Sequence, residues 1–124
     1  MKTIIKKLII STILASPLFG ANADTIKLIV PVAPGGLVDN LARVVAPELS
    51  KKLNTPIVVE NKVGASGSIG TAFVADAPAN GQTLVIGNSG TINVFPLLNP
   101  SFNGYNSKSF VPVCLIGGGP LVLT

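Results

Sequence analysis

The sequence predicts an α/β fold with a mostly parallel sheet and flanking helices. Three short apolar runs, at residues 26–31, 57–60 and 83–86, have the length and composition of buried strands. Segments with helical periodicity separate these runs, at residues 37–54 and 71–79. Strands that alternate with helices form parallel sheets, because each connection crosses back over the sheet in a right-handed sense.

Residues 1–23 have the features of a signal peptide. A lysine-rich start precedes an apolar stretch at 8–20, and Ala21 and Ala23 supply the small side chains of a cleavage site. The apolar stretch is shorter than the ~20 residues that a membrane-spanning helix needs. We therefore expect cleavage after Ala23, a periplasmic location and a mature chain of one domain.

The composition argues against several classes of function. The formal net charge is +4, but three of the nine basic residues lie within 1–23, so the rest of the chain is nearly balanced and shows no sign of nucleic-acid binding. The sequence has no histidine, which removes the commonest general base and metal ligand. The single cysteine, Cys114, has apolar neighbours and is predicted to be a small buried core residue. We expect no metal and no cofactor.

The first strand ends at Pro34, Gly35 and Gly36, and a helix follows at once. Glycines let a ligand approach the backbone, and the first N–H groups of a helix have no intrahelical partner. A turn of this kind is suited to an anion. An ordinary strand-to-helix turn would use the same residue types, and this turn alone does not separate the two interpretations.

The helix predicted at 37–54 carries apolar residues at spacings of three and four. Asp39 falls in its first turn, where a carboxylate caps free N–H groups or pairs with Arg43 four residues later. Pro47 lies inside the pattern and should kink the helix or interrupt its hydrogen bonds. The apolar positions are Leu37, Leu41, Val44, Val45, Leu49 and Leu53.

Two more loops of small residues follow the second and third strands. Residues 61–70 are rich in glycine and serine, and the short helix after them ends at the turn Asn80-Gly81. The third strand opens into residues 87–91. The carboxyl ends of parallel strands share one edge of the sheet, where open α/β folds bind ligands. The convergence of three such loops favours a binding site.

The C-terminal part is less regular. A short helical turn is predicted at 95–98 and a polar loop at 99–109. Residues 110–116 are predicted to be a fourth strand, which the glycines at 117–119 end, and residues 121–123 look like the start of a fifth.

Three stretches of this sequence carry a resemblance to a known family. They read PVAPGGLVD, then VVENKVGASGSIGTAFVADAPANGQTLVIGNSGT, then FVPVCLIGGGPLVL. In order and spacing they resemble the N-terminal portion of Bug-type receptors, the extracytoplasmic solute-binding proteins of tripartite tricarboxylate transporters. The resemblance implies one incomplete lobe, residues 24–124, of a periplasmic-binding-protein (type II) fold, with the second lobe absent.

The resemblance also implies a function. Such receptors are not enzymes; they bind small carboxylates or related metabolites, including amides, and deliver them to the membrane subunits of the transporter. One lobe alone is expected to bind its ligand poorly and to expose a sheet edge near residues 110–123. The implied ligand-binding residues are Pro34, Gly35, Gly36, Asp39, Gly64, Ala65, Ser66, Gly67, Ser68, Gly70, Asn88, Ser89, Gly90 and Thr91.

Four positions depart from the pattern of the family. Val63 replaces a usual proline, Ser66 a usual glycine, and Ser68 and Phe95 usual asparagines. These differences leave the ligand open.

Other interpretations remain. The spacing of Gly64, Gly67 and Gly70 resembles a dinucleotide fingerprint, although no acidic residue ends the next strand to hold a ribose. Ser89 lies in a loose nucleophile-like turn, but the chain has no histidine to activate it. A truncated chain without function is a third alternative.

Overall fold

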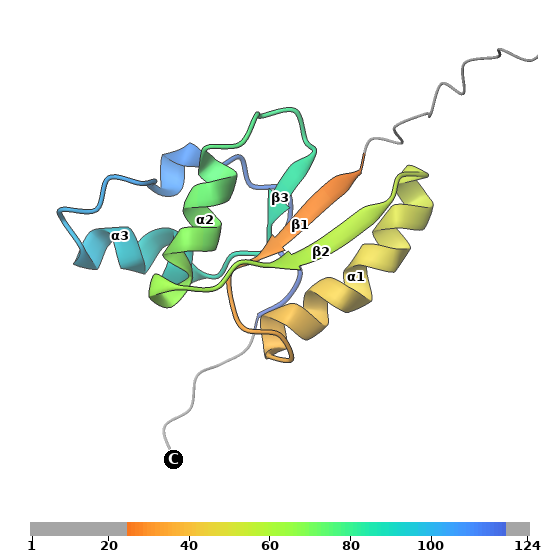
Figure 1. Ribbon diagram of the computed structural model, residues 1–124, viewed down its shortest axis with the longest axis horizontal. Helices are drawn as coiled ribbons and strands as arrows, with labels where there is room; N and C mark the ends of the chain where they lie inside the picture. Colours follow the sequence, from red (N-terminus) through yellow and green to blue (C-terminus); the bar gives the residue numbers. More distant parts are fainter. Residues whose placement is uncertain (1–24, 119–124) are drawn as a thin grey trace, which may run out of the picture.

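The computed structural model describes residues 25–118, which form a three-stranded parallel sheet with helices packed on it (Figure 1). Strand β1 (Ile26–Val30) is central, between β2 (Ile57–Asn61) and β3 (Thr83–Val85). Both neighbours run parallel to β1. The predicted α/β class and all three strands are confirmed. The predicted signal peptide and fifth strand lie outside the described residues.

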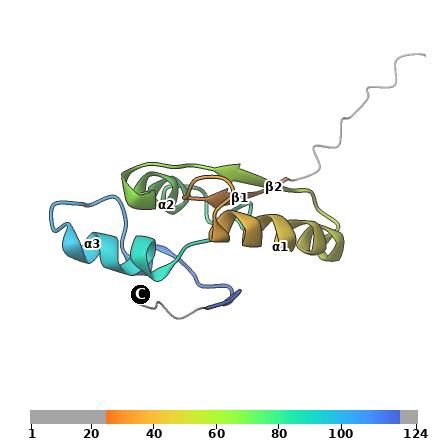
Figure 2. The ribbon, with the colours of Figure 1, turned by 90° about the horizontal axis from the view of Figure 1, so that it is seen from below.

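Helix α1 (Leu37–Leu53) joins β1 to β2, and helix α2 (Ser68–Ala75) lies between β2 and β3 in the chain. The two helices pack on opposite faces of the sheet (Figure 1, Figure 2). This arrangement follows from the strand order, because right-handed crossovers in opposite directions place their helices on opposite faces. None of the helices in the described part of the chain is long and apolar enough to cross a membrane.

Helix α1 buries a face different from the predicted one. Its buried residues are Asp39, Ala42 and Ala46, and the two alanines pack on Leu28 and Val30 of β1. Two of the expected core residues, Leu37 and Val44, are 77% and 70% exposed. Small alanine side chains let the helix approach the sheet closely, so the larger side chains lie to the sides.

Helix α1 continues through Pro47 as a single element and covers nearly the predicted range. The predicted bounds of the second helix need correction, because α2 begins three residues before the predicted Thr71 and ends at Ala75 rather than at the turn Asn80-Gly81. The glycine-rich segment after β2 therefore contains a 3₁₀ turn, η2 (Ala65–Gly67), and the first turn of α2.

The segment after β3 forms a π-helical turn, η3 (Gly90–Val94), that continues into the predicted short helix α3 (Phe95–Leu98). Four aromatic rings then pack edge to face in a chain, with centroid separations of 5.1, 5.0 and 5.7 Å. This aromatic chain anchors the polar loop at 99–109, which includes a second 3₁₀ turn, η4 (Ser107–Ser109). Its members are Phe95, Phe102, Tyr105 and Phe110.

The structure contradicts the prediction of a fourth strand at 110–116. Residues 111–118 form no regular element and are exposed, and Cys114 is exposed where a buried core residue was expected. The apolar alternation of this segment suits a strand, but a strand also needs a neighbour to satisfy its backbone groups. In the described part of the chain, only β1, β2 and β3 pair in the sheet.

Candidate functional site

Three loops meet at the carboxyl edge of the sheet, toward which the arrowheads of β1 and β2 point in Figure 1. We call them the first loop (residues 31–36), the second loop (62–67) and the third loop (86–91). A Cβ atom built on Gly67 would lie 2.6 Å from the Thr91 side chain and 3.1 Å from the Pro31 carbonyl oxygen. All three loops therefore contact one another at Gly67.

The first loop is held by the carboxylate of Asp39. Gly35, at φ +85°, donates its N–H to Asp39 Oδ2 over 2.8 Å. Arg43 Nε donates to the same oxygen over 3.0 Å. The sequence predicted that Asp39 caps free N–H groups of the helix or pairs with Arg43. The structure shows the pairing, and the N–H that Asp39 accepts belongs to Gly35, just before the helix. Asp39 is only 2% exposed.

Asn61, the last residue of β2, is a site residue that the sequence reasoning missed. Its Nδ2 donates to the Val32 carbonyl oxygen at 3.1 Å and to Asp39 Oδ1 at 2.9 Å, and its Oδ1 accepts from Arg43 Nη2 at 3.0 Å. A signal was available in the sequence, because Asn61 is a polar residue at the carboxyl end of a mainly apolar strand. The register places it beside Val30, directly before the first loop.

These donors keep Asp39 ionised. The hydrogen bond from Arg43, followed by those from the Gly35 N–H and the Asn61 amide, lowers the pKa of Asp39 from 3.8 to about 2. The Gly35 N–H is thus bonded to a carboxylate of the protein itself. The N-cap of α1, Gly36, makes no side-chain capping bond.

The second loop has a left-handed backbone. Gly64, Ala65, Ser66 and Gly67 have φ angles of +131°, +44°, +56° and +90°. Residues other than glycine rarely adopt such angles, and runs of this kind concentrate at functional sites. Turns of this type can present successive N–H groups as an anion-binding concavity. Helix α2 then begins at Ser68, and its N-cap, Gly67, again makes no side-chain capping bond.

Two glycines of the spacing that resembles a dinucleotide fingerprint have packing roles. A Cβ atom on Gly70 would lie 2.5 Å from the Lys62 carbonyl oxygen and 3.0 Å from the Pro31 side chain. Gly67 is enclosed in the same way by Thr91 and Pro31. These two glycines allow α2 to approach the carboxyl edge of the sheet.

The third loop is closed by its own side chains. Asn88 Oδ1 accepts from the Thr91 N–H at 3.0 Å, and the Thr91 hydroxyl donates to the Asn88 carbonyl oxygen at 3.2 Å. Thr91 is buried, whereas Ser89 and Gly90 are exposed. The bonds of Asn88 and Thr91 shape the loop, and the exposed backbone at Ser89 and Gly90 is the part that a ligand can reach.

The residues implied by the resemblance thus divide into two groups. One group is exposed at the carboxyl edge, and the other is buried beneath it; Gly64 is intermediate. The exposed group is Pro34, Gly35, Gly36, Ala65, Ser66, Asn88, Ser89 and Gly90. The buried group is Asp39, Gly67, Ser68, Gly70 and Thr91.

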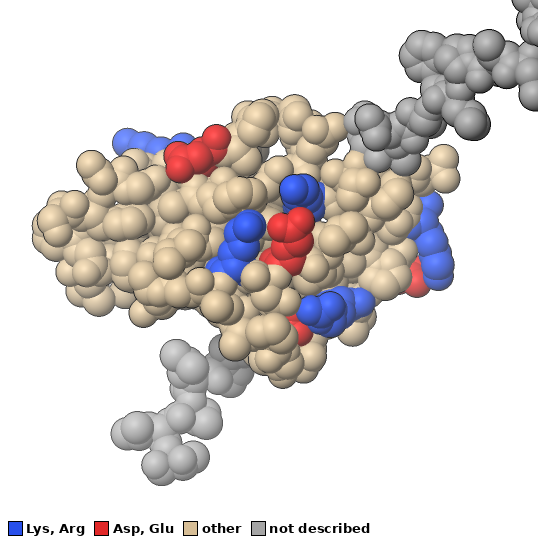
Figure 3. Space-filling model, in the orientation of Figure 1, with Lys and Arg blue, Asp and Glu red and all other residues tan. Residues whose placement is uncertain are grey.

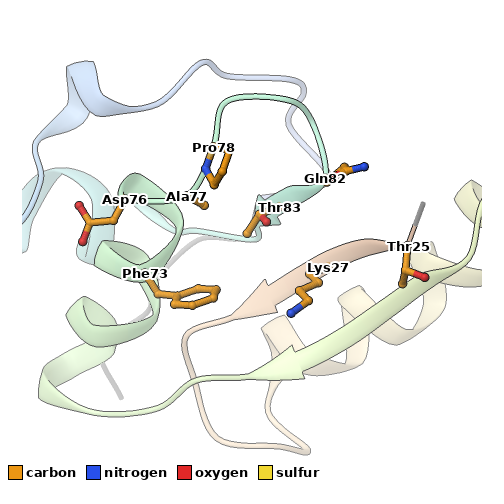
Figure 4. A pocket seen from close by; sticks show the side chains of 8 residues that line it. All are labelled: Thr25, Lys27, Phe73, Asp76, Ala77, Pro78, Gln82 and Thr83. Carbon is orange, nitrogen blue, oxygen red and sulfur yellow. The ribbon is translucent and has the colours of Figure 1, made fainter. Parts of the chain in front are cut away.

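A shallow pocket of about 360 Å³ lies elsewhere, between α2 and the amino ends of β1 and β3 (Figure 4). Phe73 and Lys27 face it, and Asp76 also lines it. The pocket carries charges of both signs and includes none of the residues implied by the resemblance. On the face seen in Figure 3, basic and acidic side chains likewise lie near one another. Lys27 and Glu60 form an ion pair at 3.8 Å.

Residues 41–124 match the model of the family described as the tripartite tricarboxylate transporter family receptor. Protein BugT of Bordetella pertussis is 42% identical over 108 residues, which cover 82% of this chain and 33% of BugT. The chain therefore spans about a third of the length of this relative.

Solved structures agree with the sequence match. MatC from Rhodopseudomonas palustris with bound malate is 38% identical, with a TM-score of 0.69, over 74% of this chain and 31% of MatC. Rpa4515 of R. palustris with adipate is 41% identical, with a TM-score of 0.52, over 53% of this chain and 22% of that protein. The family match, the identity to BugT and the shared fold lead to one conclusion: this chain belongs to the tripartite tricarboxylate transporter receptor family.

Proposed function

We propose that this chain forms the N-terminal lobe of an extracytoplasmic receptor that binds small carboxylates and delivers them to the membrane subunits of a tripartite tricarboxylate transporter. The observation that carries the proposal is the meeting of three loops at one sheet edge, where α1 and α2 both begin without side-chain caps. The malate and adipate named with the two R. palustris proteins support a carboxylate. The role is one of binding, with no chemical step.

The anion is held by backbone N–H groups in this proposal. The first N–H groups of a helix lack intrahelical partners, and the dipoles of α1 and α2 favour negative charge at this edge. In α2 the N–H of Ser68 is already bonded to the Ala65 carbonyl oxygen, so the later N–H groups of its first turn are the donors in question. Hydrogen bonds to a charged group contribute roughly 1.5–3 kcal/mol each. Four of them would supply a large share of the roughly 8 kcal/mol of a micromolar complex.

The structure makes Gly36→Val a sharp test of this mode. A Cβ atom at Gly36 would have its nearest neighbour, the Ala33 carbonyl oxygen, at 3.6 Å, and the φ of −76° suits any residue. The fold should tolerate valine there, while the side chain blocks approach to the start of α1. We expect loss of malate and adipate binding in Gly36→Val, with an unchanged unfolding midpoint.

Lys62→Ala is the matched control. The Lys62 ammonium lies 4.3 Å from the centre of the Phe73 ring and is not one of the backbone donors. Its removal should weaken binding by about 1 kcal/mol or less, as for an exposed charge. Loss of binding in Lys62→Ala together with normal binding in Gly36→Val would overturn the backbone mode.

The single lobe should bind weakly, because one wall leaves most of a ligand in water whereas binding pockets bury most of a ligand's surface. Halving the contacts would cost about 4 kcal/mol, or roughly a thousandfold in affinity. Amide shifts in an NMR titration with malate and adipate detect such weak binding. A micromolar calorimetric response from a monomer would show that no second lobe is required.

Export is part of the same proposal. Protein produced with residues 1–23 and recovered from the periplasm should begin at Asp24 by mass spectrometry. An uncleaved chain in the membrane fraction would contradict it.

A further inference from the structure

Arg43, Asp39 and Asn61 form a closed triangle of side chains, in which each member is hydrogen-bonded to the other two. Arg43 donates to Asp39 and to Asn61, both at 3.0 Å, and Asn61 donates to Asp39 at 2.9 Å. Its members come from α1 and from the end of β2. The triangle therefore joins the first turns of α1 to the carboxyl end of β2.

Two backbone bonds connect this triangle to the first loop. Asn61 Nδ2 donates to the Val32 carbonyl oxygen at 3.1 Å, and the Gly35 N–H donates to Asp39 at 2.8 Å. The two bonds lie near opposite ends of the first loop. Residue 62, which follows Asn61 directly, begins the second loop, and its N–H is bonded to the Val30 carbonyl oxygen at 2.9 Å. The geometry thus fixes the first loop against the start of the second.

The triangle also balances charge. Asp39 is buried and would present an unpaired carboxylate close to the edge where an anion is proposed to bind. The Arg43 guanidinium supplies the opposite charge through a hydrogen-bonded contact, which is stronger than a neutral hydrogen bond. Asn61 bonds both charged groups without adding charge of its own.

We propose that Asn61 and Arg43 are positioning residues of the ligand site, which hold the first loop in register with the second and neutralise Asp39. The effect of these residues on ligand binding rests on the proposed function. Their effect on the conformation of the first loop, which is the geometric part of the proposal, does not. The two parts need separate measurements.

Amide hydrogen exchange of Gly35 tests the geometric part in the full chain. Asn61→Ala and Arg43→Gln should each speed Gly35 exchange by about tenfold, since the bond from Gly35 to Asp39 then opens locally. The internal reference is the N–H of Ile86, which is bonded to the Ile29 carbonyl oxygen in the sheet. Its exchange should stay unchanged. Unchanged Gly35 exchange, or equal acceleration at Ile86, would overturn the positioning role.

Lys51→Gln is the matched control for Arg43→Gln. It breaks another ion pair of α1, Lys51 with Glu48 at 2.9 Å, which lies near the other end of the helix. Gly35 exchange should not respond to it. An equal response to Lys51→Gln would assign the effect to helix charge in general and overturn the role of the triangle.

Malate titration followed by amide shifts tests the consequence for binding. We expect the dissociation constant to rise about tenfold in Asn61→Ala, in proportion to the loss of loop order. If malate shifts no amide of the parent protein, the proposed function fails while the exchange result still decides the geometric part. If Asn61→Ala binds malate as the parent does despite faster Gly35 exchange, the positioning role in binding is wrong.

Discussion

The hydroxyl of Tyr105 donates a 2.6 Å hydrogen bond to the carbonyl oxygen of Thr91, fourteen residues earlier in the chain. The bond is buried, and it connects the aromatic chain of the C-terminal segment to the third loop. Burial also raises the pKa of Tyr105, because the ionised form would lose solvation. The third loop is therefore fixed from outside the sheet as well as by its own side chains.

Tyr105→Phe should destabilise the protein by about 1–3 kcal/mol, because it leaves the buried Thr91 carbonyl oxygen without this donor. The ring contacts with Phe102 and Phe110 remain, so the loss reports the hydrogen bond alone. Urea unfolding midpoints of the two proteins measure the effect. Tyr105→Leu, which also removes the ring, should cost more. An unchanged midpoint in Tyr105→Phe would show that the bond contributes nothing to stability.

Gly70→Ala should destabilise the protein by about 1–3 kcal/mol or prevent folding, since its Cβ atom would meet backbone that cannot move aside. The nearest atom would be the Lys62 carbonyl oxygen at 2.5 Å. Gly36→Ala is the control at the same edge, with no neighbour closer than 3.6 Å. Thermal unfolding of both variants checks the contrast. Equal midpoints for the two would contradict the close packing of α2.

Ser66→Gly should stabilise the protein. Ser66 has φ +56°, and a left-handed backbone costs a residue with a side chain about 1–2 kcal/mol. Glycine avoids that cost but loses about 0.5–1 kcal/mol of conformational entropy, so the net gain should be about 0.5–1 kcal/mol. Ser66→Ala keeps the strain and should show no gain in chemical unfolding. A gain in Ser66→Ala equal to that in Ser66→Gly would argue against backbone strain.

Asp39 should make stability depend on pH in the acid range. Its pKa is about 2 in the folded protein, below the ordinary value of 3.8. The unfolded chain therefore binds a proton first as the pH falls. The contribution of Asp39 is complete above about pH 4 and is lost as the pH approaches 2. The difference in unfolding midpoint between the parent and Asp39→Asn should shrink over this window, and a constant difference would show that the pKa of Asp39 is not lowered.

The exposed segment at 111–118 should promote self-association. Val111, Val113 and Leu115 alternate along it, and Val113 is 83% exposed. Exposed extended apolar segments are templates for pairing with another chain. Val113→Lys should reduce association in sedimentation velocity, with little change in the unfolding midpoint. An identical distribution of species for Val113→Lys and the parent would assign association to another surface.

The sequence predicted the structure correctly where the local residue pattern and the tertiary fold favour the same secondary structure. The three strands were predicted because their apolar runs are short and end at small residues, and parallel pairing followed from the helices between them. The face of α1 was predicted wrongly, because periodicity ranks large apolar residues above the alanines that a close-packed helix needs. The prediction of a strand at 110–116 was wrong for a different reason. The residues alternate as in a strand, but no strand of the described sheet pairs with them.

The candidate site was predictable in position but not in its division of roles. Glycines after each strand place the site at the carboxyl edge. The spacing of these glycines does not reveal that Gly67 and Gly70 serve close packing, whereas Gly36 has room for a Cβ atom. Asn61 was missed because its role depends on three partners brought together from 18 to 29 positions away in the chain.

The strand order has a kinetic consequence. The central strand, β1, comes first in the chain, yet residue 26 pairs with residue 57 and residue 27 with residue 83. In the described sheet every pair of hydrogen-bonded strands is separated by a long stretch of chain, so each ladder forms only after that stretch has closed into a loop. Topologies dominated by such distant contacts fold more slowly than helical bundles of similar stability. A ribosome adds about 5–20 residues per second, so β1 is exposed for seconds before β3 emerges.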